Sequence, residues 1–555
     1  MRNEAEPAED RWGSSRARLV AVVIGAAFTV IVGRSAQVAL AGDASTSRPH
    51  ASREVARRAD IVDRKGELLA TTLPAYSLSA DPSVIWDAGD VARGLASVLP
   101  GLDVRDLTKR LSDKDRQFVW VQRGLTPAQR QAVFKLGLEG LHFQEEQVRV
   151  YPGGHLAGHL LGFANVDGKG IDGVERVFNT QLAKGGAPLK LTIDSGVQFA
   201  LESELERATE DFTFKGAAGI VVDASTGAVR AIASWPFIDP NHPGDRTDTA
   251  ATDRATNSVF ELGSIYKPLT VAAAIEAGDL TPQDTFDVTN PIKVGSALIH
   301  DEHPFEHSSA FTATDIIAYS SNVGAVQIGQ RLGPEKLKAF LDSVGLLDRP
   351  SFDGPSSAAP LTPASWDPLT AATVSFGHGI AVSPLSFVMS YVPFANGGDY
   401  LQPLFVEPAD PAAIKRRRVM SPETAHTVVA MMRQTVLVGT GKNAAAPGYE
   451  VAGKTGTAEK PGPDGYDPNA NVTSFAAVFP ASRPQYVVLV VLDDAQPKTG
   501  DRRTAAYTSA SIVGRFIARA APLLDVHPVL QEPVETPIGP AGQPGTRTAS
   551  ESRTL

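Results

Sequence analysis

The sequence contains no cysteine among its 555 residues. Disulfides, zinc ribbons, iron–sulfur clusters and thiol catalysis are therefore excluded. A basic excess is also missing, since the formal net charge is -10, and this argues against a general nucleic-acid-binding protein. Hydrophobic residues make up 43% and charged residues 21% of the chain, which excludes a wholly disordered chain, a collagen-like fibre and a multi-span membrane protein. The length predicts roughly two to four domains.

An uncharged run near the N-terminus covers residues 19–33 and continues past Arg34. A helix of about 22 residues, rising ~1.5 Å per residue, would just cross the hydrocarbon core of a bilayer. The alternative is a cleavable signal peptide, because residues 39–41 have the small-x-small form of a cleavage site. Arg34 interrupts the approach to that site, so we expect an uncleaved transmembrane anchor over residues 19–40 and a tail over residues 1–18.

The rest of the chain divides into two modules and a tail. Residues 41–187 alternate short strand-like and helical patterns. In residues 188–524 strands lie at both ends of a helical region, which predicts an α+β fold: an antiparallel β-sheet flanked by helices. The expected strands are 217–222, 228–234, 449–457, 472–479 and 486–492, and the expected helices are 264–277, 313–331, 334–344 and 505–518. Frequent prolines and few apolar groups predict a disordered tail over residues 525–555.

Two motifs have the spacing or composition of a cofactor or metal site, but the residues around them argue against such a site. Residues 168–173 have the spacing of a dinucleotide fingerprint, but no clear strand–turn–helix crossover surrounds them. His300, His303 and His307 have the composition of a metal cluster, but Pro304 breaks any helix that would align them. We therefore predict glycine-rich and polar loops here, with no metal site and no cofactor.

A Ser-x-x-Lys motif is formed by Ser264 and Lys267. Gly263 precedes a helix-like run, Pro268 is tolerated only near a first turn, and Gly278 ends the run. The motif therefore places Ser264 at a helix N-terminus, with Lys267 one turn further along the same face. A hydroxyl is a poor nucleophile unless an adjacent base takes its proton. A lysine can be that base only if burial or a neighbouring cation lowers its pKa.

A second motif, Lys454-Thr455-Gly456-Thr457, lies on a predicted strand. Because Gly456 has no side chain, we expect that a ligand backbone could lie against this strand as an added β-strand. The Lys-Thr-Gly pattern is repeated at residues 498–500, but that copy leads into a polar turn. We therefore assign the function to the first copy.

A third motif, Ser320-Ser321-Asn322, is set between the helical stretches 314–319 and 323–331. On its own it indicates only a polar junction between helices. Together, the three motifs resemble the S-x-x-K, S-x-N and K-T-G motifs of the active-site serine penicillin-recognising enzymes.

Further segments resemble one group of these enzymes, the class B penicillin-binding proteins. They are residues 60–70, 151–154, 170–175, 191–194, 254–256 and 377–380. The resemblance implies a single N-terminal anchor, a non-catalytic pedestal (dimerisation-type) domain and an extracytoplasmic transpeptidase domain with a serine β-lactamase-like fold. The continuation of the strand motif through Tyr466 to residues 474–477 resembles the septal, cell-division subtype. The chain has no room for a glycosyltransferase module.

The resemblance also implies a role for each motif residue in a two-step acyl transfer. Ser264 attacks the D-Ala–D-Ala carbonyl of a stem peptide, with Lys267 as the base. Ser320 relays a proton to the departing D-Ala, and Asn322 orients the peptide amide. The identity of the general base is disputed within this superfamily.

The strand motif is expected to bind and polarise the donor. Lys454 supplies positive field, and Thr455 and Thr457 on either side of Gly456 bind the terminal carboxylate of the donor or of a β-lactam. The backbone N–H groups of Ser264 and Thr457 form the oxyanion hole.

The resemblance further implies partners and a location. The substrates are lipid-II-derived peptidoglycan stem peptides, and β-lactams are covalent inhibitors. Other expected partners are the cytoplasmic membrane, a septal glycosyltransferase and further divisome membrane proteins. The N-terminus is then cytoplasmic, and the catalytic domain lies outside the inner membrane at the septum. Four alternatives stay open: an elongation-type transpeptidase, a D,D-carboxypeptidase or β-lactamase-like hydrolase, a non-catalytic division scaffold, and a β-lactam sensor.

Overall fold

The computed structural model describes residues 57–302, 305, 310–408, 410, 412, 414–462, 465–500 and 502–529, together with 19–20, 22–30 and 32–34. The chain divides into two units, residues 1–57 and 58–555. In the first unit the described residues between 19 and 34 are helical. No helix in the described part of the chain is long and apolar enough to span a membrane. The predicted anchor's last residues, 35–40, lie outside the described residues.

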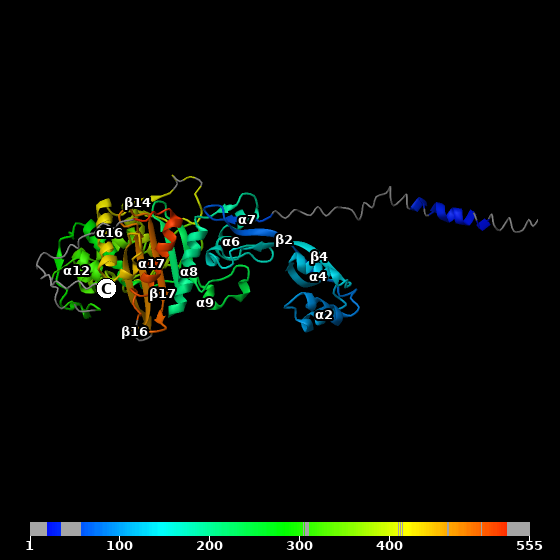
Figure 1. The fold of residues 1–555 in the computed structure, drawn as a ribbon, viewed down its shortest axis with the longest axis horizontal. Helices are drawn as coiled ribbons and strands as arrows, with labels where there is room; N and C mark the ends of the chain where they lie inside the picture. The colour runs from blue at the N-terminus through cyan, green and yellow to red at the C-terminus, as the bar shows by residue number, and fades with distance from the viewer. Residues whose placement is uncertain are drawn as a thin grey trace, which may run out of the picture. The chain divides into compact units, whose positions relative to one another are not determined.

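The second unit begins with a five-stranded sheet in which β2 (Leu68–Ala80) is central. It pairs antiparallel with β1 (Ile61–Val62), β3 (Val119–Leu125) and β4 (Leu141–Val150), and β1 pairs parallel with β5 (Leu189–Lys190). Strands β2 and β4 and the helices α2 and α4 near them are labelled in Figure 1, in blue and cyan. Within the segment 60–70, β1 and the start of β2 form a strand–turn–strand.

Three helices pack on this sheet: α2 (Ala88–Val98), α3 (Val104–Leu111) and α4 (Pro127–Lys135). They share a small apolar core with β2 and β3, to which Leu95, Leu107 and Val133 contribute. A capping box at Thr126 starts α4, followed by Pro127 in the first turn. This part of the first module therefore has a core of its own, whereas Ile61, Leu69 and Val174 belong to the large core that also covers the second sheet.

The second sheet is antiparallel and has the strand order β15-β16-β17-β7-β8. Its strands are β7 (Gly216–Asp223), β8 (Ala228–Trp235), β15 (Ala452–Gly462), β16 (Gly465–Phe479) and β17 (Tyr486–Asp493). All five expected strands are confirmed, as is the α+β class. Two of them, β15 and β16, continue beyond the predicted limits into a hairpin that closes between Gly462 and Gly465.

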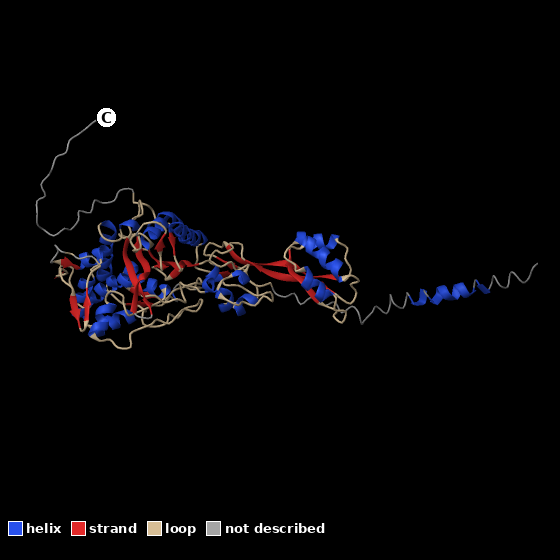
Figure 2. Ribbon diagram, turned by 90° about the horizontal axis from the view of Figure 1, so that it is seen from below, coloured by secondary structure: helices blue, strands red, loops and turns tan. Residues whose placement is uncertain are grey.

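Helices cover both faces of this sheet, as Figure 2 shows in blue and red. One face packs on α8 (Ser195–Asp211) and α17 (Ser509–Ala520), and the other on α15 (Pro384–Asn396). Successive side chains along β17 point to opposite faces of the sheet. Val488 and Val490 therefore lie in the core with α8 and α17, and Leu489 lies in the core with α15. Both faces of the sheet are therefore buried.

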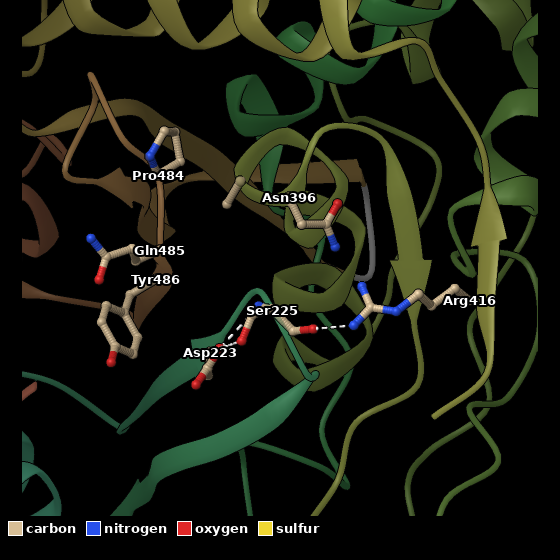
Figure 3. Close-up of a pocket in the computed structure, with 8 residues that line it drawn as sticks. Asp223, Ser225, Asn396, Arg416, Pro484, Gln485 and Tyr486 are labelled. Carbon is tan, nitrogen blue, oxygen red and sulfur yellow. Dashed lines mark hydrogen bonds between the residues drawn. The ribbon is translucent and has the colours of Figure 1, made fainter. Parts of the chain in front are cut away.

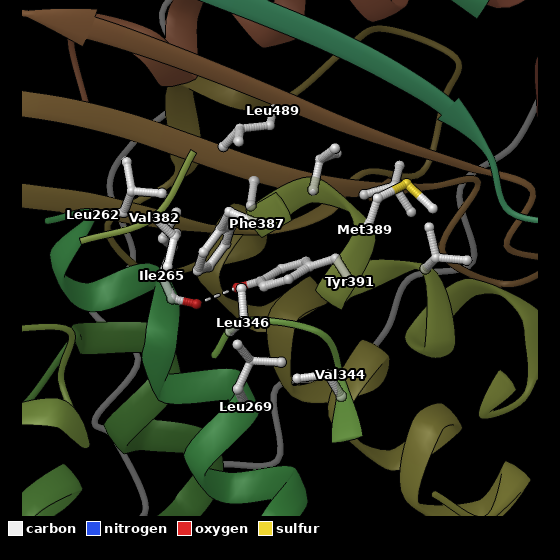
Figure 4. Packing of buried hydrophobic residues seen from close by; sticks show 14 of the residues in the cluster. Leu262, Ile265, Leu269, Val344, Leu346, Val382, Phe387, Met389, Tyr391 and Leu489 are labelled. Atoms are coloured by element: carbon white, nitrogen blue, oxygen red, sulfur yellow. Dashed lines mark hydrogen bonds between the residues drawn. The ribbon is translucent and has the colours of Figure 1, made fainter. Parts of the chain in front are cut away.

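The core in which α15 packs also contains the apolar residues on either side of Ser264. Figure 4 shows Phe387 and Tyr391 of α15 packed against Ile265 and Leu269. The hydroxyl of Tyr391 donates to the carbonyl of Ile265 at 2.6 Å. A buried polar bond of this kind fixes the segment to the core.

The helical region contains α10 (Lys267–Glu276), α11 (Ala313–Tyr319), α12 (Asn322–Leu332), α13 (Pro334–Ser343), α14 (Pro368–Val374) and α16 (Pro422–Leu437). The helical region expected over residues 313–331 divides into α11 and α12 at the predicted junction, where Ser320 has φ 66°. The shorter elements are α5 (Gly158–Leu161), α6 (Gly173–Val177), α7 (Asn179–Ala183), α9 (Asp248–Ala251), β6 (Phe212–Thr213), β9 (Thr285–Phe286), β10 (Ile292–Val294), β11 (Ala297–Ile299), β12 (Phe311–Thr312), β13 (Asp399–Leu401), β14 (Arg416–Arg418) and β18 (Gln496–Pro497).

The first residues of the predicted C-terminal tail belong to the packed domain. Val526 lies in the core beneath α8 and α17, and the N–H of Val529 donates to the carbonyl of Gly448 at 2.8 Å. Residues 530–555 lie outside the described residues.

Candidate active site

Ser264 lies in a 3₁₀ turn (η2, Gly263–Tyr266) that leads directly into α10. Side chains three residues apart eclipse in a 3₁₀ turn, so Ser264 and Lys267 lie on the same face. Gly263 has φ +60°, and a Cβ there would meet the carbonyl oxygen of Thr457 at 2.8 Å. The turn therefore needs glycine both for its backbone conformation and for its close approach to β15.

The ammonium group of Lys267 joins the first motif to the third. This side chain is fully buried, and its Nζ lies 2.5 Å from the carbonyl oxygen of Ser320, 3.2 Å from Ser320 Oγ and 2.8 Å from Asn322 Oδ1. The structure thus brings Lys267 into contact with two residues that lie 53 and 55 positions later in the sequence.

The Ser320 backbone adopts the left-handed conformation, which is costly for a residue with a Cβ. Ser320 ends α11, and Ser321 caps α12 by accepting a hydrogen bond from the N–H of Gly324 at 3.0 Å. The strained backbone at Ser320 directs its side chain toward Lys267. The end of α11 and the start of α12 both remain capped.

Asp301 fixes this junction, and the sequence analysis did not find it. One carboxylate oxygen accepts from Ser321 Oγ at 2.8 Å. The other accepts from the backbone N–H groups of Asn322 and Val323, the latter at 3.1 Å. A carboxylate at a helix N-terminus satisfies amide groups that have no partner inside the helix. Its signal in the sequence is weak, because Asp301 lies 20 positions before the motif in a loop.

Burial dominates the electrostatics of Lys267. Desolvation lowers its pKa to about 7, although the carboxylates of Asp301 and Glu302 act in the opposite direction. The sequence analysis allowed either burial or a neighbouring cation as the cause, and burial is the larger effect here. A large fraction of this lysine is therefore neutral near pH 7, as a general base requires.

Lys454 is the second buried cation. Its Nζ lies 3.0 Å from the carbonyl oxygen of Thr455 and 3.3 Å from Thr455 Oγ1. Burial first, and then the charge of Lys267, lower its pKa well below the usual value. An arriving carboxylate would restore the charged form, because it supplies the partner that the empty site lacks.

Gly456 packs against protein, which corrects one expectation. A Cβ at this position would lie 2.3 Å from the carbonyl oxygen of Leu262 and 2.4 Å from Ser474 Oγ. Ser474 Oγ also donates to that carbonyl at 3.2 Å. The glycine therefore lets β15 contact the nucleophile turn and does not leave room for a ligand. The unpaired side of β15 is instead the one that a ligand backbone would pair with, because β15 is the terminal strand of its sheet.

A cavity of about 350 Å³ opens between these elements. Ser264, Ser320, Thr455 and Thr457 line it together. The other lining residues are Asp301, Glu302, Phe305, Tyr319, Thr440, Thr504, Ala506 and Tyr507. The hydroxyls of Thr440 and Thr455 are 2.6 Å apart. The hydroxyl of Ser264 and several other hydroxyl groups therefore surround one space, and the buried amine of Lys267 contacts Ser320 in its wall, an arrangement that suits acyl transfer to serine.

His300 lies beside the third motif, where its carbonyl accepts from Asn322 Nδ2 at 3.3 Å, whereas the repeated Lys-Thr-Gly pattern does not line this cavity. Lys498, in the repeated Lys-Thr-Gly pattern, donates to the carbonyl of Thr209 at 2.6 Å and is exposed. Within the described residues no cluster of three potential ligands could hold a metal ion. His303 and His307 lie outside the described residues.

The larger cavity in Figure 3, of about 610 Å³, is also separate from the motif residues. It lies at the β7–β8 turn, where Arg416 donates to the carbonyl oxygen of Ser225 at 2.6 Å. None of its lining residues belongs to the three motifs.

We expect Asp301→Asn to slow acylation about tenfold and to destabilise the fold by about 1–3 kcal/mol, because bonds to a half-buried carboxylate are lost. Removing the carboxylate also removes an interaction that raises the pKa of Lys267. The midpoint of the acylation pH profile should therefore move to lower pH, and stopped-flow acylation across pH would measure this.

Asp287→Asn is the matched control, since the carboxylate of Asp287 bonds within its own turn at Thr289. A midpoint in Asp301→Asn that stays at the wild-type pH would contradict the electrostatic role of Asp301.

The fold and the site define a class of protein. The family model for the penicillin binding protein transpeptidase domain matches residues 217–517, and the model for the penicillin-binding protein dimerisation domain matches residues 53–186. The chain belongs to the penicillin-binding protein transpeptidase family, with the two-domain architecture of the class B members.

Individual relatives are similar over most of the chain. The chain is 39% identical over 485 residues to the probable peptidoglycan D,D-transpeptidase FtsI of Caulobacter vibrioides, covering 84% of this chain and 82% of the relative. It is 30% identical over 505 residues to the peptidoglycan D,D-transpeptidase FtsI of Escherichia coli K12, covering 85% and 84%. The crystal structure of penicillin-binding protein 3 of Mycobacterium tuberculosis, complexed with ampicillin, matches with a TM-score of 0.67 at 25% identity, covering 86% and 97%.

Proposed function

We propose that this chain is a septal peptidoglycan D,D-transpeptidase that cross-links stem peptides through an acyl-enzyme on Ser264. The observation that carries the proposal is the buried Lys267, whose Nζ contacts Ser320 and Asn322. Because it shares a helical face with Ser264, its neutral amine can take the proton of the attacking hydroxyl.

In the first step Ser264 Oγ attacks the carbonyl carbon of the D-Ala–D-Ala bond. The backbone N–H groups of Ser264 and Thr457 stabilise the oxyanion. The proton taken by Lys267 passes through Ser320 to the departing D-Ala amine, and Asn322 orients the donor amide. The C–N bond breaks, and the donor peptide stays esterified to Ser264.

The strand motif holds the donor during this step. Lys454 and the hydroxyls of Thr455 and Thr457 bind its terminal carboxylate, while the donor backbone lies along the free edge of β15. A β-lactam carboxylate would occupy the same position. β-Lactams would then acylate Ser264 and inhibit the enzyme, which requires no cofactor.

In the second step the amine of a neighbouring stem peptide attacks the ester. The product is a cross-link, and Ser264 Oγ regains a proton. A D,D-carboxypeptidase or a β-lactamase-like hydrolase would pass the same acyl group to water. The identity to D,D-transpeptidases across both domains favours the transferase.

The test is to incubate purified protein with lipid-II-derived glycan and to separate the muropeptides by chromatography. We expect cross-linked dimers, and none with Ser264→Ala. Release of D-Ala without any dimers would instead show a carboxypeptidase. Failure to react with glycan and penicillin alike would favour a non-catalytic scaffold, and penicillin binding without any glycan reaction would favour a β-lactam sensor.

Lys454→Ala should slow acylation by about 10²–10³-fold, because a buried charge that stabilises the bound carboxylate is lost. The matched control is Lys498→Ala in the repeated pattern, which should leave acylation nearly unchanged because exposed charges contribute little. Rates of penicillin acylation measure both. If Lys498→Ala slowed acylation more than Lys454→Ala, the Lys-Thr-Gly pattern at residues 498–500 would be the functional one.

For the domains, we propose a cytoplasmic tail (1–18), a transmembrane anchor (19–40), a pedestal domain (41–187), a transpeptidase domain (188–524) and a C-terminal segment (525–555) whose first residues pack on that domain. The long uncharged run supports the anchor. The catalytic domain then lies outside the inner membrane, where its substrate is.

The anchor predicts that mature protein isolated from membranes retains residues 19–40. N-terminal sequencing of that protein measures this directly. A sequence that begins at Gly42 would show a cleaved signal peptide instead.

The septal assignment is supported by the similarity to the FtsI proteins. A septal glycosyltransferase and other divisome membrane proteins are the partners that this assignment implies. Depletion should give filamentous cells with blocked septa, observed by microscopy. Round or swollen cells would indicate an elongation-type enzyme.

A further inference from the structure

A groove of about 560 Å³ lies beyond the far end of the catalytic motif on β15. Its apolar lining includes Val259, Phe260, Leu361, Ala381, Pro461 and Val472. Phe260 and Val472 are buried, whereas Leu361 is 63% exposed at the rim. The groove is therefore an open channel with an apolar floor, and it is large enough for part of a peptide.

Two segments of the chain run from the catalytic cavity to the groove, although the two cavities share no lining residue. Glu261 lines the groove three positions before Ser264, and Glu459 lines it two positions after Thr457. Side chains two apart in a strand share a face, so Thr455, Thr457 and Glu459 form one row along β15. At ~3.3 Å per residue, Glu459 lies about 7 Å along the strand from Thr457.

The cations that line the groove are already engaged. Lys460 pairs with Asp493. The guanidinium of Arg254 donates to the carbonyls of Thr249 at 2.9 Å and Lys215 at 3.2 Å. Neither positive group is therefore available to a ligand in the groove.

Two carboxylates remain available to a ligand. Glu261 accepts a hydrogen bond from the hydroxyl of Tyr466 at 2.9 Å, and the backbone N–H of Gly379 also stabilises its charged form. Glu459 is exposed, and no other described side chain or backbone group forms a hydrogen bond or ion pair with its carboxylate. The end of the groove nearest the nucleophile is thus acidic and suits an ammonium group on a mostly apolar chain.

We propose that this groove binds the acceptor stem peptide, with Glu459 and Glu261 holding its side-chain ammonium beside the acyl-enzyme. The inference rests on the proposed transpeptidase function, because only a transferase needs a second peptide. The donor occupies the catalytic cavity, so the acceptor requires separate space that reaches Ser264. The groove is separate from that cavity and is lined by Glu261, three residues before Ser264, and its carboxylates match the charge of the incoming group.

In the transfer step the bound ammonium first releases one proton to solvent and becomes a neutral amine. Its nitrogen attacks the acyl carbon, the bond between that carbon and Ser264 Oγ breaks, and a C–N bond forms. The second proton of the nitrogen passes through Lys267 to Ser264 Oγ.

The test follows the partition of one acyl-enzyme between hydrolysis and transfer. A thioester donor that ends in a D-alanine analogue forms the acyl-enzyme. The acceptors are stem tetrapeptides with a free lysine or diaminopimelate amine. Glu459→Gln should raise the acceptor concentration for half-maximal transfer about fivefold, and Glu459→Lys about twentyfold, because like charges repel. Penicillin acylation should stay within about twofold of wild type, because donor binding is untouched.

Glu210→Gln, which changes an exposed glutamate on α8, is the matched control and should leave the partition unchanged. If both Glu459 variants reached half-maximal transfer at the wild-type acceptor concentration, the groove proposal would be overturned, and the transpeptidase function would not be affected. A parallel loss of penicillin acylation would also overturn it, because Glu459 would then act on the donor. Wild-type protein that only hydrolyses its acyl-enzyme would contradict the transpeptidase function itself.

Discussion

Ser264→Ala is expected to abolish covalent labelling by a fluorescent penicillin, with acylation slowed on the order of 10⁴-fold or more. The substitution removes the hydroxyl that would form the ester, and no other described hydroxyl is placed one 3₁₀ turn before the buried lysine. The contacts of Lys267 with Ser320 and Asn322 do not involve Ser264, so the fold should persist. In-gel fluorescence and thermal unfolding measure the two effects.

Ser365→Ala, at an exposed serine just before α14, is the control and should be labelled normally. If Ser264→Ala folded with the wild-type Tm and still labelled, another residue would be the nucleophile.

Lys267→Ala should also reduce acylation by several orders of magnitude, about 10³-fold or more, because the serine loses its base. In the wild type the base form is the neutral amine, and burial sets its pKa at about 7. Acylation should therefore rise with pH through about 7 and level off above it, and at pH 6 only about one tenth of the lysine is neutral. The measurement is the acylation rate from pH 5 to 9.

A profile that falls as pH rises through 7 would mean that the protonated lysine is the active form. Normal acylation by Lys267→Ala would assign the proton transfer to another group.

The strands and the motif residues could be predicted because their signals are local. Apolar runs on both sides of a polar turn predicted β7 and β8, and they pair as expected. The Ser-x-x-Lys spacing predicted a shared face whether the segment is an α-helix or the observed 3₁₀ turn. Local spacing was enough, since both geometries place residues three apart close together.

Other parts of the fold depend on contacts that a local pattern does not reveal. The helix α15 was not expected, because it is buried nearly all round and contains Pro393, so it has no polar stripe. Gly456 was misinterpreted because its neighbour, the carbonyl of Leu262, comes from a segment about 190 residues earlier. Asp301 was missed for the same reason: only tertiary structure places its carboxylate at the start of α12.

The direct test of the account is to locate the acyl group. Full-length protein is incubated with benzylpenicillin and digested, and the peptides are sequenced by mass spectrometry. We predict a penicilloyl adduct on the peptide that contains Ser264, at that residue. An adduct on Ser320 or on any other side chain, or no adduct at all on a folded protein, would contradict the account.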